Sequence, residues 1–244
     1  MEFLHPTDHP VESAAGNSAA QVVADDAVIE TFWPDMSLDL SRTALVLVDP
    51  QRAFLHPDGM LWPAVGENVM ANRVVEHLEW LVEAAAHTGM MRFVCPHHHE
   101  HDRAAGIGVG RVAGWAGAVR ASARAGEDGD IMPELLPFLE DEKVVVTGSH
   151  RLGGLANREL LQELRSRRIE HVILAGMCAN LCLEGHLREL VEHNFEVAVV
   201  RDATAGIAVD GIDGQAAALT SFRLLAHAVW DTREAILRMY GKDR

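Results

Sequence analysis

Cysteine is scarce in this chain of 244 residues, which contains only three. None of them stands at the paired spacings that are typical of a disulfide framework or a zinc site. No apolar run approaches the roughly 20 residues that a membrane-spanning helix requires. The N-terminus lacks the basic start and apolar centre of a secretory signal. These absences indicate a soluble, cytoplasmic protein in a reducing compartment, without a membrane partner.

Positive charge is also scarce. Lysine and arginine total 21 against 36 aspartates and glutamates, which gives a formal net charge of −15. Such a surface repels phosphate backbones and anionic lipid, so we expect no binding to nucleic acid or to a membrane surface. A small-molecule substrate is the partner that we expect.

Hydrophobic residues make up 48% of the chain, which is enough for one large core. Residues 1–40 show no sustained periodicity, and we interpret them as an N-terminal extension or arm. From residue 41 to 244 strand-like and helix-like segments alternate, with a long loop at 97–131 that holds one helix around 115–124. Strands are predicted at 44–49, 91–96, 143–148, 171–176, 196–206 and 227–231, and helices at 69–89, 156–169, 182–194, 215–227 and 232–241. The alternation predicts a single doubly wound α/β domain with a six-stranded, mostly parallel sheet flanked by helices.

Asp49 ends the first predicted strand, in the segment ALVLVDPQRAF. An aspartate at such a position often only caps the following turn. In open parallel sheets, however, the ligand crevice lies at the carboxyl ends of the strands, where a carboxylate can act as a general base. Both interpretations stay open from this segment alone.

Cys182 follows another predicted strand, in the segment VILAGMCANLCLEGHLREL. A lone cysteine in an α/β protein is usually an inert buried hydrophobe. Here Asn180 is placed to cap the helix, so that Cys182 falls in its first turn, where the helix dipole favours a thiolate. Cys182 also lies off the apolar stripe of the helix, alongside His186. This placement favours a nucleophile that acts on a carbonyl.

Four segments share a pattern with one known superfamily. They are Asp49-x-Gln51-x-x-Phe54, Gly153-Gly-Leu-Ala-Asn-Arg-Glu-Leu160, Gly176-Met-Cys-Ala-Asn-Leu-Cys182 and Val200-Arg-Asp-Ala-Thr-Ala205. In this order and spacing, the chain resembles the isochorismatase-like cysteine hydrolases, which include the nicotinamidases and N-carbamoylsarcosine amidohydrolase. The resemblance implies a six-stranded parallel sheet and usually a homo-oligomer. We expect no cofactor.

By this resemblance the nucleophile maps to Cys182 and the acid/base carboxylate to Asp49. The oxyanion hole would use the backbone N–H groups of Cys182 and Cys178, which makes Cys178 a substrate-binding position. A cis peptide bond would precede it, at Met177–Cys178. The thiolate would attack a carbonyl, Asp49 would pass the proton to the leaving nitrogen, and water would release the acyl-enzyme.

The lysine of the family's catalytic triad is missing from this chain. Counting without gaps places Ser149 at its position, and the only two lysines of the chain lie elsewhere. His150 or Arg151 would then supply the missing positive charge, and we take His150 as the third catalytic residue. The family's threonine four residues after the nucleophile is also replaced, here by His186.

A run of histidines follows the second predicted strand, in the segment PHHHEHD. Alternate residues of an extended segment share a face, so His97, His99 and His101 could point together toward a metal. A solvent-exposed polar loop is the simpler alternative, and a histidine that contacts substrate is favoured over a metal ligand. We therefore expect no metal, and take His99 and Trp62 as substrate-binding residues.

The leading hypothesis is a cysteine hydrolase that cleaves a small-molecule amide, ureido or related C–N bond through a thioester. Cys182 would be the nucleophile and Asp49 the acid/base group. A vinyl-ether hydrolase of the isochorismatase type would need Asp49 but not the thiol. A non-catalytic relative that binds a small molecule or a protein would account for the missing lysine, and a bis-histidine metal enzyme is a fourth alternative.

Overall fold

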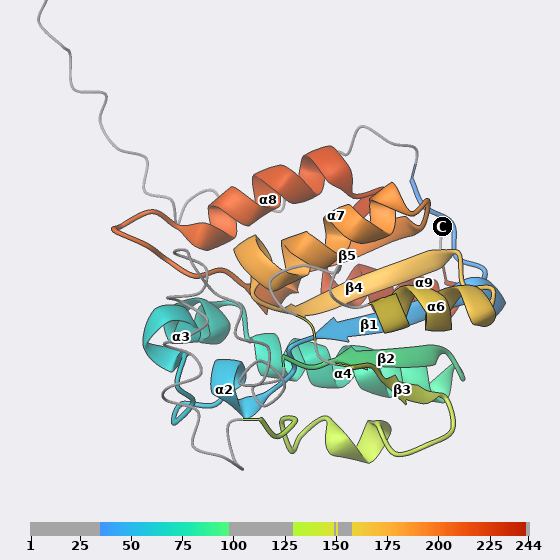
Figure 1. Ribbon diagram of the computed structural model, residues 1–244, viewed down its shortest axis with the longest axis horizontal. Helices are drawn as coiled ribbons and strands as arrows, with labels where there is room; N and C mark the ends of the chain where they lie inside the picture. The colour runs from blue at the N-terminus through green and yellow to red at the C-terminus, as the bar shows by residue number, and fades with distance from the viewer. Residues whose placement is uncertain (1–34, 98–128, 149, 151–157, 243–244) are drawn as a thin grey trace, which may run out of the picture.

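A computed structural model of the chain describes residues 35–97, 129–148, 150 and 158–242. Strands and helices alternate along it, as the colours of Figure 1 show. The strands are β1 (Thr43–Val48), β2 (Met91–Cys95), β3 (Val144–Val146), β4 (His171–Met177), β5 (Glu196–Ala205) and β6 (Ala228–Trp230). The α-helices are α2 (Arg52–Leu55), α3 (Trp62–Ala71), α4 (Val74–His87), α6 (Arg158–Ser166), α7 (Glu184–Glu192), α8 (Gly214–Leu225) and α9 (Thr232–Met239).

The six strands form one sheet in the order β3-β2-β1-β4-β5-β6, and every neighbouring pair is parallel. From β1 the chain winds outward to β2 and β3, and then returns to β4 and winds the other way. The strand order therefore reverses between β1 and β4, which is where open α/β sheets bind their ligands. The predicted doubly wound α/β fold with six strands is confirmed.

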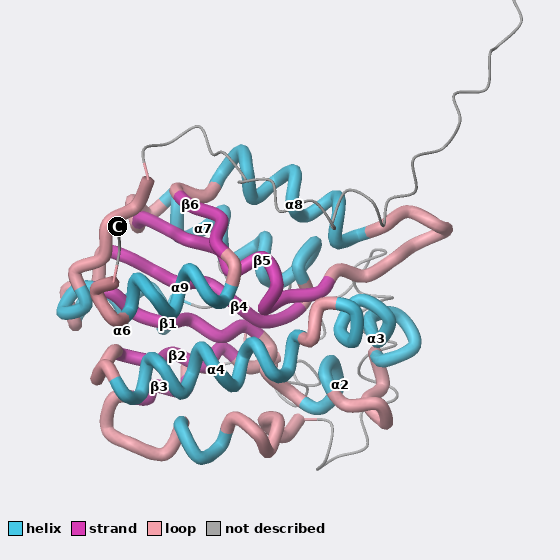
Figure 2. Tube along the Cα trace, turned by 180° about the vertical axis from the view of Figure 1, so that it is seen from behind, coloured by secondary structure: helices cyan, strands magenta, loops and turns pink. Residues whose placement is uncertain are grey.

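Helices cover both faces of the sheet, which explains why β1 is apolar and buried along its whole length. Leu45 and Leu47 face one core, which they share with α4 and α9. Val46 and Val48 face a second core, which they share with α6, α7 and α8. Figures 1 and 2 show these two helical layers from opposite sides.

The prediction of one continuous helix over 69–89 is wrong. The segment is divided between α3 and α4, and Arg73 between them has a left-handed backbone with φ of 49°. Asn68 Nδ2 donates to the carbonyl oxygen of Gly206 at 2.9 Å, and Asn72 Nδ2 donates to that of Thr204 at 3.3 Å. These contacts hold the end of α3 against the end of β5, so the helix axis changes direction before α4.

The segment just before β1 packs against the last helix. Arg238 of α9 donates to the carbonyl oxygen of Met36 at 3.0 Å and pairs with Asp35 at 2.6 Å. Met36 is buried in the first core. Most of the predicted extension, and the helix predicted around 115–124, lie outside the described residues.

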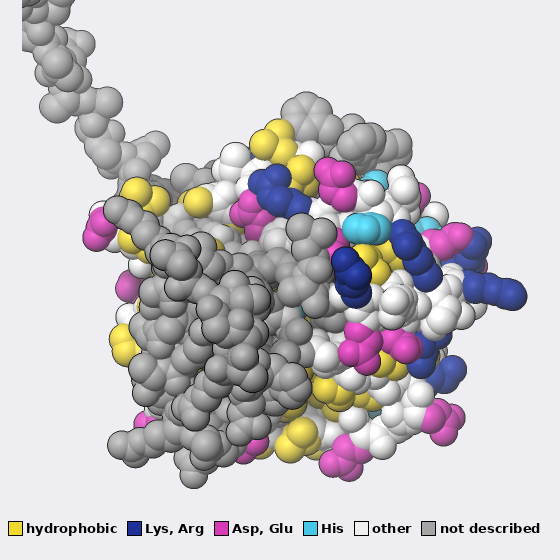
Figure 3. All heavy atoms as spheres, in the orientation of Figure 1, with side chains coloured by type: hydrophobic (Ala, Val, Ile, Leu, Met, Phe, Trp, Pro, Cys, Tyr) yellow, Lys and Arg dark blue, Asp and Glu magenta, His cyan; other side chains and the backbone are white. Residues whose placement is uncertain are grey.

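Within the described part of the chain, no helix combines the length and the apolar composition needed to cross a membrane. On the face drawn in Figure 3, the basic side chains of the described part lie interspersed with acidic ones. A mixed surface of this kind offers no continuous positive field to a polyanion.

Candidate active site

Asp49 stands immediately after β1, at the carboxyl end of the sheet. Its backbone is left-handed, with φ of 49°, a conformation that aspartate tolerates better than most residues. Its N–H donates to the carbonyl oxygen of Cys95 at 3.0 Å, which continues the pairing of β1 with β2. The side chain is completely buried, so this carboxyl group must find its polar partners inside the protein.

His150 is the partner of this carboxyl group. Its Nε2 lies 2.7 Å from Asp49 Oδ1 and 3.2 Å from the carbonyl oxygen of Cys95. His150 follows β3 and forms an isolated parallel bridge with His97, which follows β2. The side chains of His150 and Asp49 are both fully buried, so water does not weaken their interaction.

The environment of Asp49 favours the charged carboxylate. Burial is the largest single influence and raises the pKa of Asp49, and the charge and the hydrogen bond of His150 oppose it. The charge of His97 acts in the same direction, and the net pKa is below the usual value for aspartate. Asp49 is therefore ionised at neutral pH and available as a base.

Cys182 lies in a five-residue π-helical turn, Ala179–Leu183, that connects β4 to α7. The Met177–Cys178 peptide bond before this turn is cis, where the resemblance to the family places it. The expectation that Asn180 caps the helix is wrong, because its side chain exchanges two hydrogen bonds with the backbone of Ile207. Cys178 occupies the cap position instead, and no side chain caps the turn.

The expected activation of Cys182 by a helix terminus is not what the structure shows. The residue is completely buried. Burial raises the pKa of the Cys182 thiol well above its usual range, and the negative charge of Asp49 raises it further. The sulfur therefore carries its proton at neutral pH.

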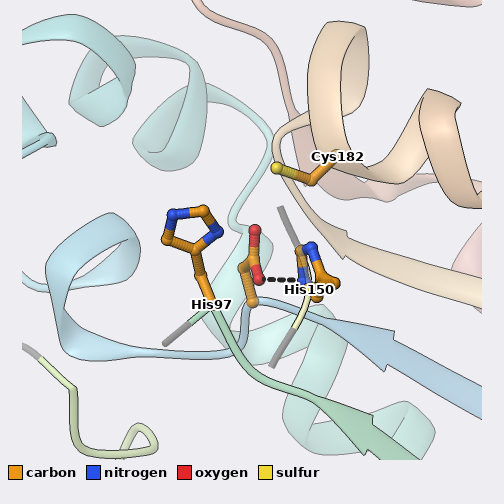
Figure 4. Close-up of side chains that lie close together, drawn as sticks. His97, His150 and Cys182 are labelled. Carbon is orange, nitrogen blue, oxygen red and sulfur yellow. Dashed lines mark hydrogen bonds and ion pairs between the residues drawn. The ribbon is translucent and has the colours of Figure 1, made fainter. Parts of the chain in front are cut away.

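Four side chains meet at this point. One ligating or reactive atom from each of Asp49, His97, His150 and Cys182 lies within 4.8 Å of all the others, and all four residues are buried. Figure 4 shows the Cys182 sulfur and the rings of His97 and His150 approaching one another from separate elements. The structure thus brings together the three residues predicted to be catalytic and adds His97.

The sequence identifies His97 as part of a histidine run but does not predict its place beside Asp49, His150 and Cys182. His97 comes two residues after β2, and Asp49 comes one residue after the neighbouring β1, so the strand register could have indicated their proximity. Gln51 holds the backbone of His97 from both sides: its Oε1 accepts from the N–H at 2.8 Å, and its Nε2 donates to the carbonyl oxygen at 3.0 Å. This geometry assigns Gln51 a positioning role.

The His186 ring packs against the His150 ring. The two rings meet edge to face, with centroids 4.5 Å apart. His186 Nδ1 lies 2.7 Å from the carbonyl oxygen of Cys182 and must donate its proton there. Burial, followed by the charge of His150, lowers the pKa of His186 to about 4, so the ring is neutral. It supports His150 without adding charge to the site.

The other predicted site residues have different positions. Cys178 is buried beside the cluster, at the start of the π-helical turn. Trp62 is the first residue of α3 and packs against the first core, where Gly66 leaves room for its ring. His99, His101, Ser149 and Arg151 lie outside the described residues. The substrate-binding roles of Cys178, His99 and Trp62 stay predictions.

With this geometry in place, the chain can be compared with known proteins. The family model of the isochorismatase domain matches residues 43–234. The chain belongs to the isochorismatase family. Among curated proteins, a ureidoacrylate amidohydrolase from Caulobacter segnis is 27% identical over 179 residues, covering 68% of this chain and 74% of that protein.

Solved structures of the isochorismatase family type share the fold. A cysteine hydrolase from Pseudomonas syringae pv. phaseolicola has a TM-score of 0.73 and 23% identity, covering 90% of this chain and 100% of that one. An N-carbamoylsarcosine amidase from Thermoplasma acidophilum has a TM-score of 0.55 and 19% identity, covering 78% of this chain and 96% of that one. The predicted family, fold and enzyme class, a hydrolase, are confirmed. The homo-oligomer and the cytoplasmic location stay predictions.

Proposed function

We propose that this isochorismatase-family member hydrolyses a C–N bond of a small amide or ureido compound, with Cys182 as nucleophile, Asp49 as acid/base group and His150 in place of the family's lysine. The observation that carries the proposal is the 2.7 Å contact between Asp49 and His150 in the buried cluster that also holds Cys182. The similarity to a ureidoacrylate amidohydrolase supports a ureido compound as the substrate class.

The first half of the reaction forms a thioester. Asp49, which is ionised at rest, removes the proton from the Cys182 thiol as the sulfur attacks the substrate carbonyl. The backbone N–H groups of Cys178 and Cys182 would stabilise the oxyanion. The C–N bond then breaks, and Asp49 returns the proton to the leaving nitrogen, so that an amine leaves and the acyl group stays on sulfur.

The second half consumes one water molecule. Asp49 takes a proton from that water, whose oxygen attacks the thioester carbonyl, and the C–S bond breaks with return of the proton to sulfur. The sum is one C–N bond hydrolysed, with Cys182 regenerated. A ureido substrate that releases its amine from the carbamoyl group would yield carbamate, which decomposes to ammonia and carbon dioxide.

His150 is our candidate for the role of the missing lysine because its Nε2 lies 2.7 Å from Asp49 Oδ1. Its hydrogen bond holds one oxygen of Asp49 and leaves the other to exchange protons with sulfur and substrate. Unlike the compact ammonium group of a lysine, the planar imidazole offers a second ring nitrogen on its far side.

The test is a screen of ureido acids, N-carbamoyl amino acids and simple amides, with ammonia release as the readout. Turnover should fall by at least about 1,000-fold in Cys182→Ala, since covalent catalysis is lost. Cys95→Ala is the matched control, because Cys95 is also buried but lies outside the four-residue cluster. Undiminished turnover in Cys182→Ala would rule out the thioester route.

Two alternatives give different outcomes in the same screen. A vinyl-ether hydrolase would act on a vinyl ether added to the panel, and it would lose that activity in Asp49→Asn and keep it in Cys182→Ala. A non-catalytic relative, which the missing lysine would explain, would turn over no member of the panel but would show saturable binding of one of them by calorimetry.

A further inference from the structure

The cluster of Asp49, His97, His150 and Cys182 is also a set of metal ligands. It offers one carboxylate, two imidazoles and one sulfur, each from a buried residue. Imidazole and thiolate are donors that suit Zn²⁺ and similar transition metals, whereas Mg²⁺ and Ca²⁺ prefer sites made of oxygen alone. The donor set therefore selects a borderline or soft divalent ion.

The separations are close to those of a tetrahedral site. Bonds of 2.0–2.3 Å to a zinc ion place neighbouring ligand atoms about 3.4 Å apart. All four donor atoms lie within 4.8 Å of one another. Side-chain rotations that move these atoms by about 1 Å would bring them to the separations of a tetrahedral site. No movement of the strands is required.

The charges balance when an ion is bound. A divalent cation, the Asp49 carboxylate and a Cys182 thiolate sum to zero, which removes most of the penalty for burying each charge. Asp49 Oδ2 is buried, and the Cys182 thiol is a hydrogen-bond partner of the Asp49 carboxyl group beside His150. A cation bound there would take the place of the thiol proton.

The supporting shell is already in place. Gln51 fixes the backbone of His97 with two hydrogen bonds, and the Phe54 ring packs edge-on against the His97 ring at 6.3 Å between centroids. The His186 ring packs edge to face against the His150 ring. Outer contacts of this kind orient metal ligands and raise affinity.

We infer that Asp49, His97, His150 and Cys182 bind one Zn²⁺-type ion, and that the ion blocks Cys182 as a nucleophile. Binding exchanges the thiol proton for the metal, so one proton is released and a metal–sulfur bond forms. The hydrogen bond between His150 Nε2 and Asp49 Oδ1 breaks, and each of the two residues binds the metal instead. The proton on Nε2 moves to Nδ1 of the same ring or to solvent. The blocking effect, unlike the binding, rests on the proposed function. Sequence reasoning favoured no metal because it did not place His97 beside the catalytic residues.

The direct test uses Co²⁺ as a spectroscopic probe on the full-length chain freed of metal with a chelator. One equivalent of Co²⁺ should produce visible bands of a tetrahedral ion and a near-ultraviolet band of sulfur-to-cobalt charge transfer. Zn²⁺ should remove both, and excess Mg²⁺ should remove neither. Absence of these bands at stoichiometric Co²⁺ would overturn the site.

Variants then assign the ligands. Cys182→Ser should lose the charge-transfer band, and His150→Gln should weaken Zn²⁺ binding by at least about 100-fold. Cys95→Ala and His193→Gln are matched controls that remove a thiol and a histidine outside the cluster, and they should bind as the unmodified chain does. Circular dichroism shows whether each variant is folded. A charge-transfer band that persists in folded Cys182→Ser would refute thiolate ligation.

Turnover gives an independent result. If the substrate screen yields activity, stoichiometric Zn²⁺ should suppress it by at least about tenfold and a chelator should restore it. Cobalt bands without turnover of any substrate would leave the metal site standing and count against the hydrolase. Turnover that saturating Zn²⁺ does not change would refute the block while leaving the hydrolase standing.

Discussion

The surroundings of Asp49 and Cys182 shift the pKa values of the two residues in opposite directions. His150 keeps the carboxylate charged, while burial and that same carboxylate keep the thiol neutral. The arrangement is the reverse of an exposed, low-pKa cysteine at a helix terminus. A neutral buried sulfur is protected from indiscriminate alkylation and becomes reactive only when the neighbouring base acts on it.

This arrangement predicts slow alkylation of Cys182. At about pH 7.5, labelling by iodoacetamide should be at least tenfold slower than that of a model thiol with a pKa near 8.5, because the thiolate fraction is smaller. Asp49→Asn should shift the labelling profile to lower pH, since the charge that raises the thiol pKa is gone. Peptide mass spectrometry resolves Cys182 from Cys95, whose pKa is raised to about 12 by burial. Labelling of Cys182 as fast as a model thiol would contradict this account.

His186 predicts an acid-sensitive stability. Its pKa is about 4 in the folded chain against 6.5 for an ordinary histidine, so the unfolded state binds the proton more tightly. The stability that the neutral ring contributes is complete above pH 6.5 and is lost as the pH falls toward 4. Between pH 7 and pH 5 the loss should be about 2 kcal/mol.

Urea unfolding at the two pH values measures this loss. His186→Gln removes the titrating group, so its stability should fall by about 2 kcal/mol less than that of the unmodified chain over the same interval. His193→Gln, in which His186 is intact, should keep the full fall. For each variant the unfolding free energy at pH 5 is subtracted from that at pH 7. The hydrogen bond that His186→Gln loses is missing at both pH values, so its cost drops out of this difference. Equal falls in His186→Gln and the unmodified chain would refute the assignment.

Among the elements, β1 and β4 approach each other closely at the edge that holds the site. Gly176 of β4 has φ of 115°, and a Cβ atom there would overlap the backbone oxygen of Val48. Gly176→Ala should therefore cost at least about 3 kcal/mol of unfolding free energy, by strain and by displacement of β1. Gly89→Ala is the control: its φ is also positive, at 70°, but nothing lies within 4 Å, so about 1 kcal/mol is expected. Urea unfolding measures both losses of unfolding free energy. Similar losses in Gly176→Ala and Gly89→Ala would show that β1 and β4 can move apart to accommodate the new methyl group.

The strands were predictable from sequence because a sheet covered on both faces needs unbroken apolar runs, and β1 and β4 contain ALVLV and VILAGM. The division between α3 and α4 was not, because it depends on Asn68 and Asn72 reaching residues more than 130 positions away. The role of Asn180 was misjudged for the same reason. Its partner, Ile207, is 27 residues further on and adjacent only in the folded sheet.

The site was predictable to the extent that it follows strand ends. Asp49 and Cys182 come directly after β1 and β4, and the reversal of strand order between these strands brings them together. His150 was suggested by the absence of a lysine, and the contact with Asp49 agrees with that suggestion. His97 needed the register of β2 against β1, which periodicity alone does not provide.

At the scale of the whole molecule, Arg238 joins the two ends of the described chain. It pairs with Asp35 and Glu234, donates to Met36, and lies over the Trp230 ring at 4.5 Å. Arg238→Ala should lower the unfolding free energy by about 2 kcal/mol and speed hydrogen exchange before β1. Arg188→Ala removes an exposed arginine that pairs with Glu184 of its own helix, and should cost about 0.5 kcal/mol or less. Unchanged exchange before β1 in Arg238→Ala would show that this segment is held by other contacts.

The three-residue strand β3 has a consequence for the whole molecule. It lies at the edge of the sheet, its last residue, Val146, is 61% exposed, and His150 follows four residues later. Fraying of such an edge needs far less free energy than global unfolding. On heating, catalytic turnover should therefore disappear several degrees below the melting of tryptophan fluorescence. The working lifetime of the protein would then be determined by its weakest strand, and a substitution that strengthens only β3 would extend that lifetime without raising the melting temperature.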